Sequence, residues 1–260
     1  MNILVNGISG HMGREVAALC EAGYRSANLA VGVDRVMPAA SSAPFYDSLD
    51  LIPNEAEIDC IVDFSHHSVT SSLLGFARER GIAVVLCTTG HTEEELAEIY
   101  AAAEDIPLFF SANMSLGVAL LVELAKTAAL ALPDAEIEII EKHHSRKLDA
   151  PSGTALMLAS AISSVRPEAY ANTGRSGHGK RTKEEIGIHA VRMGNVVGEH
   201  EVILATQNQT VTLKHEAHSR ALFAEGALAA AAFIVGKDAG LYDMNSIIGK
   251  TKEPSSAVTL

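Results

Sequence analysis

The chain has 260 residues, of which 48% are hydrophobic and 20% charged, a composition typical of a globular protein with one large or two modest domains. Its formal net charge of −12 argues against nucleic acid as a partner, because phosphate binding needs a basic surface. Cys20, Cys60 and Cys87 are scattered, without metal-ligand spacing, so we expect buried thiols and no metal. No apolar run is long enough to span a membrane and no targeting pattern precedes the first strand, so we expect a cytoplasmic protein without membrane contact.

A glycine-rich turn follows an apolar strand expected at residues 3–6. Its spacing, Gly-x-x-Gly-x-x-Gly, is one residue wider at the first gap than the commonest dinucleotide-binding fingerprint. A glycine turn alone is a weak signal, but a strand before it and a helix after it strengthen the prediction. The cofactor contacts expected here are Gly7, Ser9, Gly10, His11, Met12 and Gly13.

Asp34 ends the second expected strand, 21 positions beyond Gly13. An acid at this point commonly binds the adenosine ribose, and a following arginine can bind a 2′-phosphate. The pair Asp34 and Arg35 is therefore compatible with either NAD or NADP as the cofactor.

Strands and helices alternate through the first 115 residues, which predicts a Rossmann-like, doubly wound α/β domain. Further strands are expected at 30–34, 60–64, 83–86 and 107–110. Ligands bind such sheets at the carboxyl ends of the strands. The loops at that edge add candidate cofactor contacts, namely Phe64, Ser65, Thr88, Thr89, Gly90, Ser111, Asn113 and Met114. We interpret His66 and His67, in contrast, as a helix start on a solvated surface.

The pattern changes after an apolar helix expected at 116–132. Strand-like segments with few helices between them predict an α+β domain with an open, mostly antiparallel sheet, and they lie at 136–141, 186–192, 199–206 and 210–215. The alanine-rich helix expected at 220–235 can pack back on the first domain. We therefore expect a dinucleotide-binding domain at 1–114 and 219–260, and a substrate-binding and oligomerisation domain at 115–218. The polar, glycine-rich segment 172–181 is expected to be a mobile surface loop.

The densest run of reactive side chains is HHSRKLDAPSGTA at residues 143–155. An expected strand at 137–141 precedes it and an expected helix at 155–162 follows it, so we predict a strand-to-helix loop. Pro151, Ser152 and Gly153 are typical of a helix start, and the free N–H groups of such a start can bind an anion.

Two cations and two histidines share this run. Arg146 and Lys147 add positive charge, while His143 and His144 can exchange protons near neutral pH. Each residue alone fits a basic surface loop. The combination predicts a site that binds and protonates a carboxylated substrate.

These motifs resemble the dihydrodipicolinate reductase family along nearly the whole chain. The most specific matching segment is 141–155, and the others are 7–13, 88–90, 113–118 and 191–200. Cys87 stands where the family often has glycine and Ser65 where it often has threonine, and neither departure removes the expected chemistry.

The resemblance implies hydride transfer from NADPH or NADH to a cyclic, unsaturated dicarboxylate. The implied reaction reduces 4-hydroxy-tetrahydrodipicolinate to tetrahydrodipicolinate in the diaminopimelate route to lysine, in a homotetramer without a metal. Hydride that arrives at ring C4 moves electron density toward the ring nitrogen, so a proton must be supplied. The family pattern implies His143 and Lys147 as the catalytic pair, and His144, Ser152, Gly153 and Thr154 as substrate-binding residues.

Two other functions remain open. A different two-domain dehydrogenase, acting on an amino or sugar acid, would share the nucleotide-binding half but is not expected to carry the 143–155 run. A non-catalytic nucleotide sensor would keep the glycine turn but has no need of both His143 and Lys147. The sequence decides neither the preferred cofactor nor which of these two residues delivers the proton.

Overall fold

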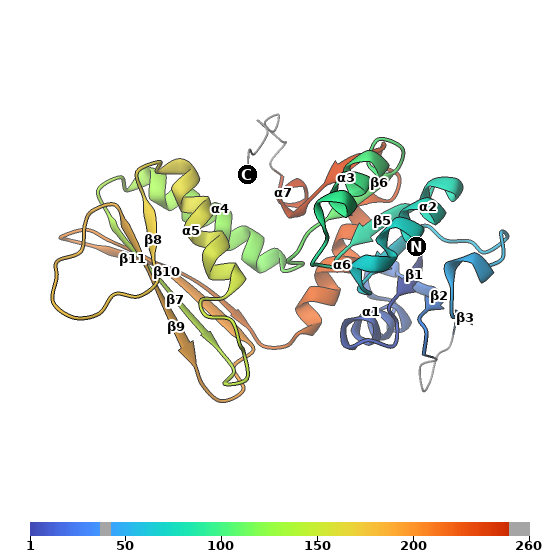
Figure 1. Cartoon of the computed structure of the whole chain (residues 1–260), viewed down its shortest axis with the longest axis horizontal. Helices are drawn as coiled ribbons and strands as arrows, with labels where there is room; N and C mark the ends of the chain where they lie inside the picture. Colours follow the sequence, from blue (N-terminus) through green and yellow to red (C-terminus); the bar gives the residue numbers. More distant parts are fainter. Residues whose placement is uncertain (37–42, 250–260) are drawn as a thin grey trace. The chain divides into compact units, whose positions relative to one another are not determined.

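The computed structural model describes residues 1–36 and 43–249, which fold into two compact units (Figure 1). The first unit contains residues 1–115 and the segment from 221 onward, and the second contains residues 116–220. Residues 250–260, which the sequence analysis assigns to the first domain, lie outside the described residues.

A seven-stranded parallel sheet in the order β12-β6-β5-β4-β1-β2-β3 forms the centre of the first unit. This confirms the predicted doubly wound sheet. Two of the strands were not predicted, because two or three residues carry too little periodicity to be recognised. The strands are β1 (Asn2–Asn6), β2 (Asn28–Val33), β3 (Phe45–Tyr46), β4 (Cys60–Asp63), β5 (Ala83–Leu86), β6 (Pro107–Phe110) and β12 (Gly240–Tyr242).

Helices cover this sheet, and its apolar side chains form the core of the unit. The helices are α1 (His11–Glu21), α2 (Thr70–Arg80), α3 (Glu93–Ala102), α6 (Ala221–Ile234) and α7 (Met244–Ile247), with short 3₁₀ turns η1 (Tyr24–Ser26), η2 (Leu49–Leu51) and η3 (His67–Val69). The alanine-rich α6 contacts α1 and strands β4, β5 and β6, as expected of a helix that returns to the first unit. Helix α6 lies so close to the backbone at Met114 that position 226 needs a glycine, because a Cβ there would lie 1.7 Å from the Met114 carbonyl oxygen.

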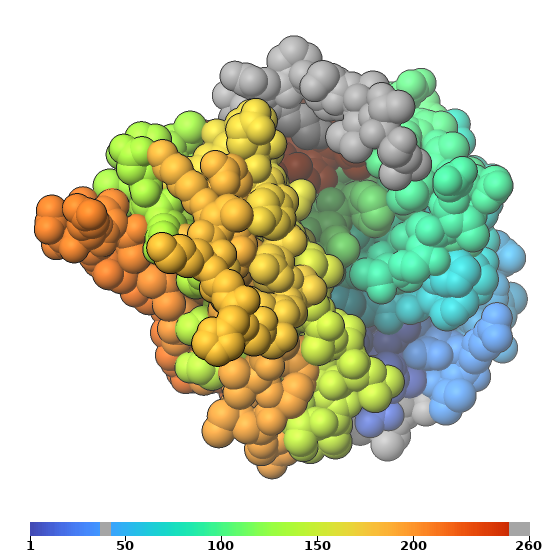
Figure 2. Space-filling model, turned by 60° about the vertical axis from the view of Figure 1, so that its left-hand side comes forward, coloured from blue at the N-terminus to red at the C-terminus, as the bar shows by residue number. Residues whose placement is uncertain are grey.

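The second unit contains an open five-stranded sheet in the order β11-β10-β7-β9-β8. Strand β10 pairs antiparallel with both neighbours, as predicted, whereas β9 joins β7 in parallel because a crossover through α5 connects them. The three-residue β8 was not predicted. Figure 2 shows the turn between β10 and β11 (orange) at the surface. The elements are α4 (Leu116–Ala131), β7 (Glu136–His143), α5 (Gly153–Val165), β8 (Tyr170–Asn172), β9 (Glu185–Arg192), β10 (Gly198–Ala205) and β11 (Thr210–Ala217).

Helices α4 and α5 bury one face of this second sheet. Leu121 of α4 and Leu158 of α5 pack with Ile137 and Ile139 of β7 in one apolar cluster. Alternate residues of a strand point to the same face, so the next two members of this row on β7 are residues 141 and 143. The buried face of β7 is therefore apolar at its first positions and polar at residues 141 and 143.

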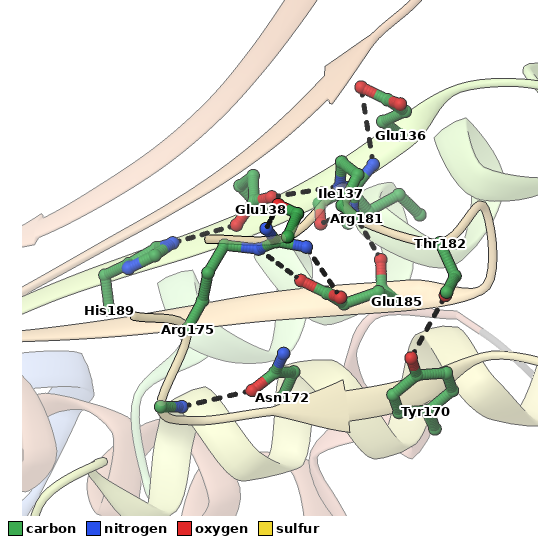
Figure 3. A network of polar contacts seen from close by, with 12 residues as sticks. Glu136, Ile137, Glu138, Tyr170, Asn172, Arg175, Arg181, Thr182, Glu185 and His189 are labelled. Atoms are coloured by element: carbon green, nitrogen blue, oxygen red, sulfur yellow. Dashed lines mark hydrogen bonds and ion pairs between the residues drawn. The ribbon is translucent and has the colours of Figure 1, made fainter. Parts of the chain in front are cut away.

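Two arginines anchor the polar segment between β8 and β9 (Figure 3). Arg175 donates to both carboxylate oxygens of the buried Glu185, at 2.8 and 2.9 Å. Arg181 donates to the backbone carbonyls of Ile137 and Glu185. The expected mobility of this segment stays a prediction, but its arginines connect it to the sheet.

The three cysteines are buried free thiols, as expected. Burial raises the pKa of the Cys20 thiol to about 12 and also raises the pKa values of Cys60 and Cys87. The thiols are therefore protonated and unreactive at neutral pH. No helix within residues 1–36 and 43–249 has both the length and the apolar character needed to cross a bilayer.

Candidate active site

The glycine turn between β1 and α1 fits against a neighbouring loop with no room for side chains. Gly7 has a φ of +81°, and a Cβ there would lie 2.8 Å from the carbonyl oxygen of Phe64. A Cβ at Gly13 would lie 2.0 Å from the Gly7 oxygen. Gly10 precedes α1 and cannot cap it with a side chain, so the first N–H groups of the helix are available to an anion.

Asp34 connects the end of β2 to this turn. Its carboxylate accepts hydrogen bonds from the Ser9 N–H at 2.9 Å and from the Arg35 N–H at 2.7 Å. Asp34 and Arg35 both line a cleft of about 730 Å³, within the usual size range of ligand pockets. The cleft brings together six predicted cofactor contacts, namely Gly7, Gly10, Asp34, Arg35, Phe64 and Ser65.

A buried carboxylate at the end of β4 supports this edge of the sheet. Asp63 is fully buried and accepts hydrogen bonds from Asn6 Nδ2 at 2.7 Å, Ser65 Oγ at 2.6 Å and Thr88 Oγ1 at 2.6 Å. Burial raises the pKa of its carboxyl, although these donors act in the opposite direction. Asp63 thus connects the ends of β1, β4 and β5, and its only sequence signal is an acid at the end of an apolar strand.

Six other predicted cofactor contacts follow β5 and β6 at the same sheet edge and do not line the described part of the cleft; nor do Ser9, His11, Met12 and Gly13, which belong to the glycine turn and the start of α1. Thr89 and Gly90 are exposed. Ser111 donates to the Asn113 carbonyl at 2.9 Å, and the Asn113 side chain accepts from the Ser115 N–H at 2.9 Å. Met114 is buried, and its carbonyl oxygen lies against Gly226.

The two histidines after β4 only partly match the expected solvated helix start. His66 is exposed, and its Nδ1 accepts from the Ser68 N–H at the start of η3. His67 instead lies with Nδ1 2.9 Å from the carboxylate of Glu95, the residue that completes the capping box of α3. His67 therefore links two helical segments rather than only facing solvent.

His143 is the last residue of β7, so the prediction that it lies in a strand-to-helix loop was wrong. The Met193 N–H donates to the His143 carbonyl at 2.9 Å and the Ser145 N–H to the Gly194 carbonyl at 3.2 Å, which extends the contact with β9. A strand places its side chain on the buried face of the sheet, more rigidly than a loop would.

Glu141 is the centre of the polar cluster on this face. It is fully buried, and its Oε1 accepts from the Ser152 N–H at 2.9 Å and from Arg192 Nη2 at 2.7 Å. Its Oε2 accepts from Arg192 Nη1 at 2.7 Å and from His143 Nδ1 at 2.6 Å. Burial disfavours the charged carboxylate, but these donors outweigh it and hold the pKa of Glu141 below its usual value.

His200 of β10 packs beside His143. Their rings lie 5.2 Å apart in an edge-on arrangement, and His200 Nε2 is 3.0 Å from Ser152 Oγ. Burial and the nearby His143 lower the pKa of His200 to about 4, so it is neutral at pH 7. Gly198 leaves space for the His143 ring, because a Cβ there would lie 3.1 Å from His143 Nε2.

The helix start beside these histidines has the predicted form. Ser152 caps α5 through the Ala155 N–H, and Gly153 and Thr154 are the first two helical residues. Lys147 Nζ lies 2.8 Å from Asp149 Oδ1, which lowers the pKa of that aspartate. Lys147 is therefore ion-paired at the edge of the site.

His144 has a lowered pKa, first through burial and then through the charges of Arg146 and other nearby cations, Lys147 among them. Arg146 itself donates to the Asn195 side chain at 2.9 Å. The predicted catalytic and substrate-binding residues of the second unit thus share one cluster. Sequence reasoning missed Glu141, Arg192 and His200, although Glu141 occupies a buried position in the strand alternation.

Comparison with known proteins links both halves of the chain to the same kind of enzyme. Family models described as dihydrodipicolinate reductase, N-terminus and C-terminus, match residues 1–114 and 117–248. The chain is 44% identical to 4-hydroxy-tetrahydrodipicolinate reductase of Caldanaerobacter subterraneus subsp. tengcongensis, over 96% of this chain and 99% of that relative.

Solved structures agree at the level of the fold. Dipicolinate-bound dihydrodipicolinate reductase from Paenisporosarcina sp. TG-14 has a TM-score of 0.80 at 24% identity, covering 94% of this chain and 98% of that one. GenD2 from gentamicin A biosynthesis, in complex with NAD, has a TM-score of 0.56 at 14% identity, covering 92% of this chain and 87% of that one.

Proposed function

The chain belongs to the dihydrodipicolinate reductase family, and we propose that it reduces 4-hydroxy-tetrahydrodipicolinate to tetrahydrodipicolinate with NADPH or NADH, in the diaminopimelate route to lysine. The observation that carries the proposal is the cluster in which Glu141 bonds both to His143 and to the start of α5 at Ser152. Groups that can supply a proton and groups that can bind a carboxylate are thereby held together.

The first unit is the NAD(P)-binding domain that the family implies, and its residues fit such a cofactor. The glycine turn and the uncapped start of α1 would hold a pyrophosphate, while Asp34 and Arg35 would meet the adenosine ribose. Because Asp34 accepts hydrogen bonds and Arg35 carries positive charge, we infer that both NADH and NADPH are used. When bound, the cofactor supplies a hydride.

The second unit supplies the proton and holds the substrate. Replacement of the C4 hydroxyl by hydrogen consumes one hydride and one proton and releases one water. His143 Nδ1 is engaged with Glu141, so Nε2 is the ring atom that can hold or deliver a proton. Lys147 is the second candidate donor, and its positive charge stabilises negative charge that develops on the ring.

The carboxylates of the substrate would bind at the start of α5. Ser152 is held in place from two sides, by Glu141 at its N–H and by His200 at its hydroxyl. The backbone N–H groups of Gly153 and Thr154 follow directly in the first helical turn, where a helix favours an anion. We propose His144 as an additional substrate-binding side chain. The proposal also includes a homotetramer in the cytoplasm.

A substrate-specificity assay tests this function against other oxidoreductases. We expect kcat/KM for the cyclic dicarboxylate to exceed that for amino acids and sugar acids by a factor of about 1,000 or more, because only the former fits both the proton donors and the carboxylate site. Equal or higher kcat/KM with a sugar or amino acid would identify a different dehydrogenase. Nucleotide binding without turnover of any acid would favour a nucleotide sensor.

A further inference from the structure

The four donors around the Glu141 carboxylate give this side chain a role beyond stability. Three of them come from distant parts of the chain: Arg192 on β9 supplies two and the Ser152 backbone at the start of α5 supplies the third, while His143 supplies the fourth from the same strand. Both oxygens are therefore fully used, and all of the contacts are to donors. A carboxylate in this position accepts but cannot donate.

We propose that Glu141 is a positioning residue that keeps the neutral His143 ring in the tautomer with the proton on Nδ1, so that the other ring nitrogen faces the substrate. The proposal rests on the proposed function for its catalytic consequence but not for the tautomer itself. Because an ionised Glu141 can only accept, His143 Nδ1 must carry a hydrogen in the 2.6 Å contact. The Nε2 atom then has a free lone pair when the ring is neutral and a proton to donate when the ring is charged.

The residues around His143 favour the same tautomer. Arg192 forms a bidentate pair with Glu141 and compensates its charge, which keeps the carboxylate ionised although it is buried. The neighbouring His200 is neutral and already contacts Ser152, so it does not compete for the same carboxylate. The Nε2 atom lies beside Gly198, where a Cβ would come within 3.1 Å of it, so the missing side chain leaves space next to this nitrogen.

Glu141→Gln tests the positioning role of Glu141 without changing the size of the side chain. The glutamine amide must direct its NH₂ group toward one pair of donors, either Arg192 with His143 or Arg192 with Ser152. Only the ring of His143 can adapt, because its Nδ1 becomes an acceptor when the proton moves to Nε2. The substitution therefore switches the tautomer, and we expect kcat to fall about 100-fold or more while KM for the dicarboxylate changes much less.

Glu185→Gln is the matched control. Glu185 is also buried in this sheet and also accepts a bidentate bond from an arginine, Arg175, but contacts no histidine (Figure 3). Both variants lose a similar ion pair, so a comparable fall in melting temperature is expected in each. Only the change at Glu141 should lower kcat.

The deciding experiment is ¹⁵N NMR of histidine-labelled full-length protein above the pH at which His143 becomes neutral, with the His143 signals assigned by their loss in His143→Gln. The wild-type protein and Glu185→Gln should show a protonated Nδ1 and an unprotonated Nε2, and Glu141→Gln should show the reverse. A protonated Nε2 in the neutral wild-type protein, or wild-type kcat in a folded Glu141→Gln, would overturn the proposal. If Glu141→Gln does not fold, the wild-type spectrum alone decides. A wild-type protein with the expected tautomer but no reductase activity would instead refute the proposed function.

Discussion

Replacement of Gly13 by alanine should damage the cofactor site and the stability of the first unit together. The new Cβ would lie 2.0 Å from the Gly7 carbonyl oxygen, 2.7 Å from the Gly7 carbonyl carbon and 2.7 Å from the Ile8 Cα. All three atoms belong to the backbone, so no side-chain rotation relieves the contact. The turn between β1 and α1 must therefore move. Such overpacking costs about 3 kcal/mol, which lowers the melting temperature of a chain of this size by about 6–12 °C.

Gly75→Ala provides the control within the same unit. Gly75 lies inside α2, is exposed, and a Cβ there meets no atom within 4 Å. Alanine is favoured over glycine in a helix by about 1 kcal/mol, so this variant should melt about 2–4 °C higher.

The assay combines thermal unfolding with calorimetric titration of NADH and NADPH. We expect Gly13→Ala to weaken both nucleotides at least about 10-fold, because the N–H groups at the start of α1 move with the turn. Gly75→Ala should leave both affinities unchanged. Wild-type stability and nucleotide affinity in Gly13→Ala would refute the packing argument and the placement of the cofactor at this turn.

Three further predictions concern charged residues. Lys147→Ala should lower kcat about 100- to 10,000-fold with little change in the cofactor dissociation constant, and near wild-type kcat would remove Lys147 from the mechanism. Arg35→Ala should raise KM for NADPH and leave KM for NADH nearly unchanged, whereas equal losses would show that Arg35 does not bind the 2′-phosphate. Asp63→Asn should stabilise the protein at a pH where Asp63 is ionised, since the amide can accept from Asn6 and Ser65 and donate to the Thr88 hydroxyl without a buried charge. Because the pKa of Asp63 is raised in the folded state, protonation stabilises the folded wild-type protein as the pH falls. Denaturation curves should therefore show that the stability difference between the variant and the wild-type protein shrinks as the pH approaches the unfolded-state pKa. A stability difference that grows in acid would contradict this prediction.

The parallel sheet and the glycine turn could be predicted because their signals are local. Each long strand of this sheet contains at least three consecutive apolar residues, and the three glycines follow one of them directly. Short strands such as Phe45–Tyr46 carry no such signal. Their pairing depends on the neighbouring strand, which sequence alone does not place.

The site was predictable in its reactive groups but not in its connections. The run from His143 to Thr154 is continuous in sequence, so its chemistry could be recognised. Glu141 and Arg192, however, are 51 positions apart, and their pairing depends on the parallel register of β7 with β9. The same register extends β7 to His143, which the apolar pattern alone placed in the loop.

The most direct test of the account is the reaction itself. Purified protein should be supplied with substrate made in place by the preceding synthase, and NADH and NADPH oxidation followed in parallel with identification of the product. We predict oxidation of both cofactors that depends on the synthase, equals the tetrahydrodipicolinate formed, and is largely lost in Lys147→Ala. Cofactor oxidation without that product, or no oxidation by folded protein that binds both nucleotides, would contradict the account.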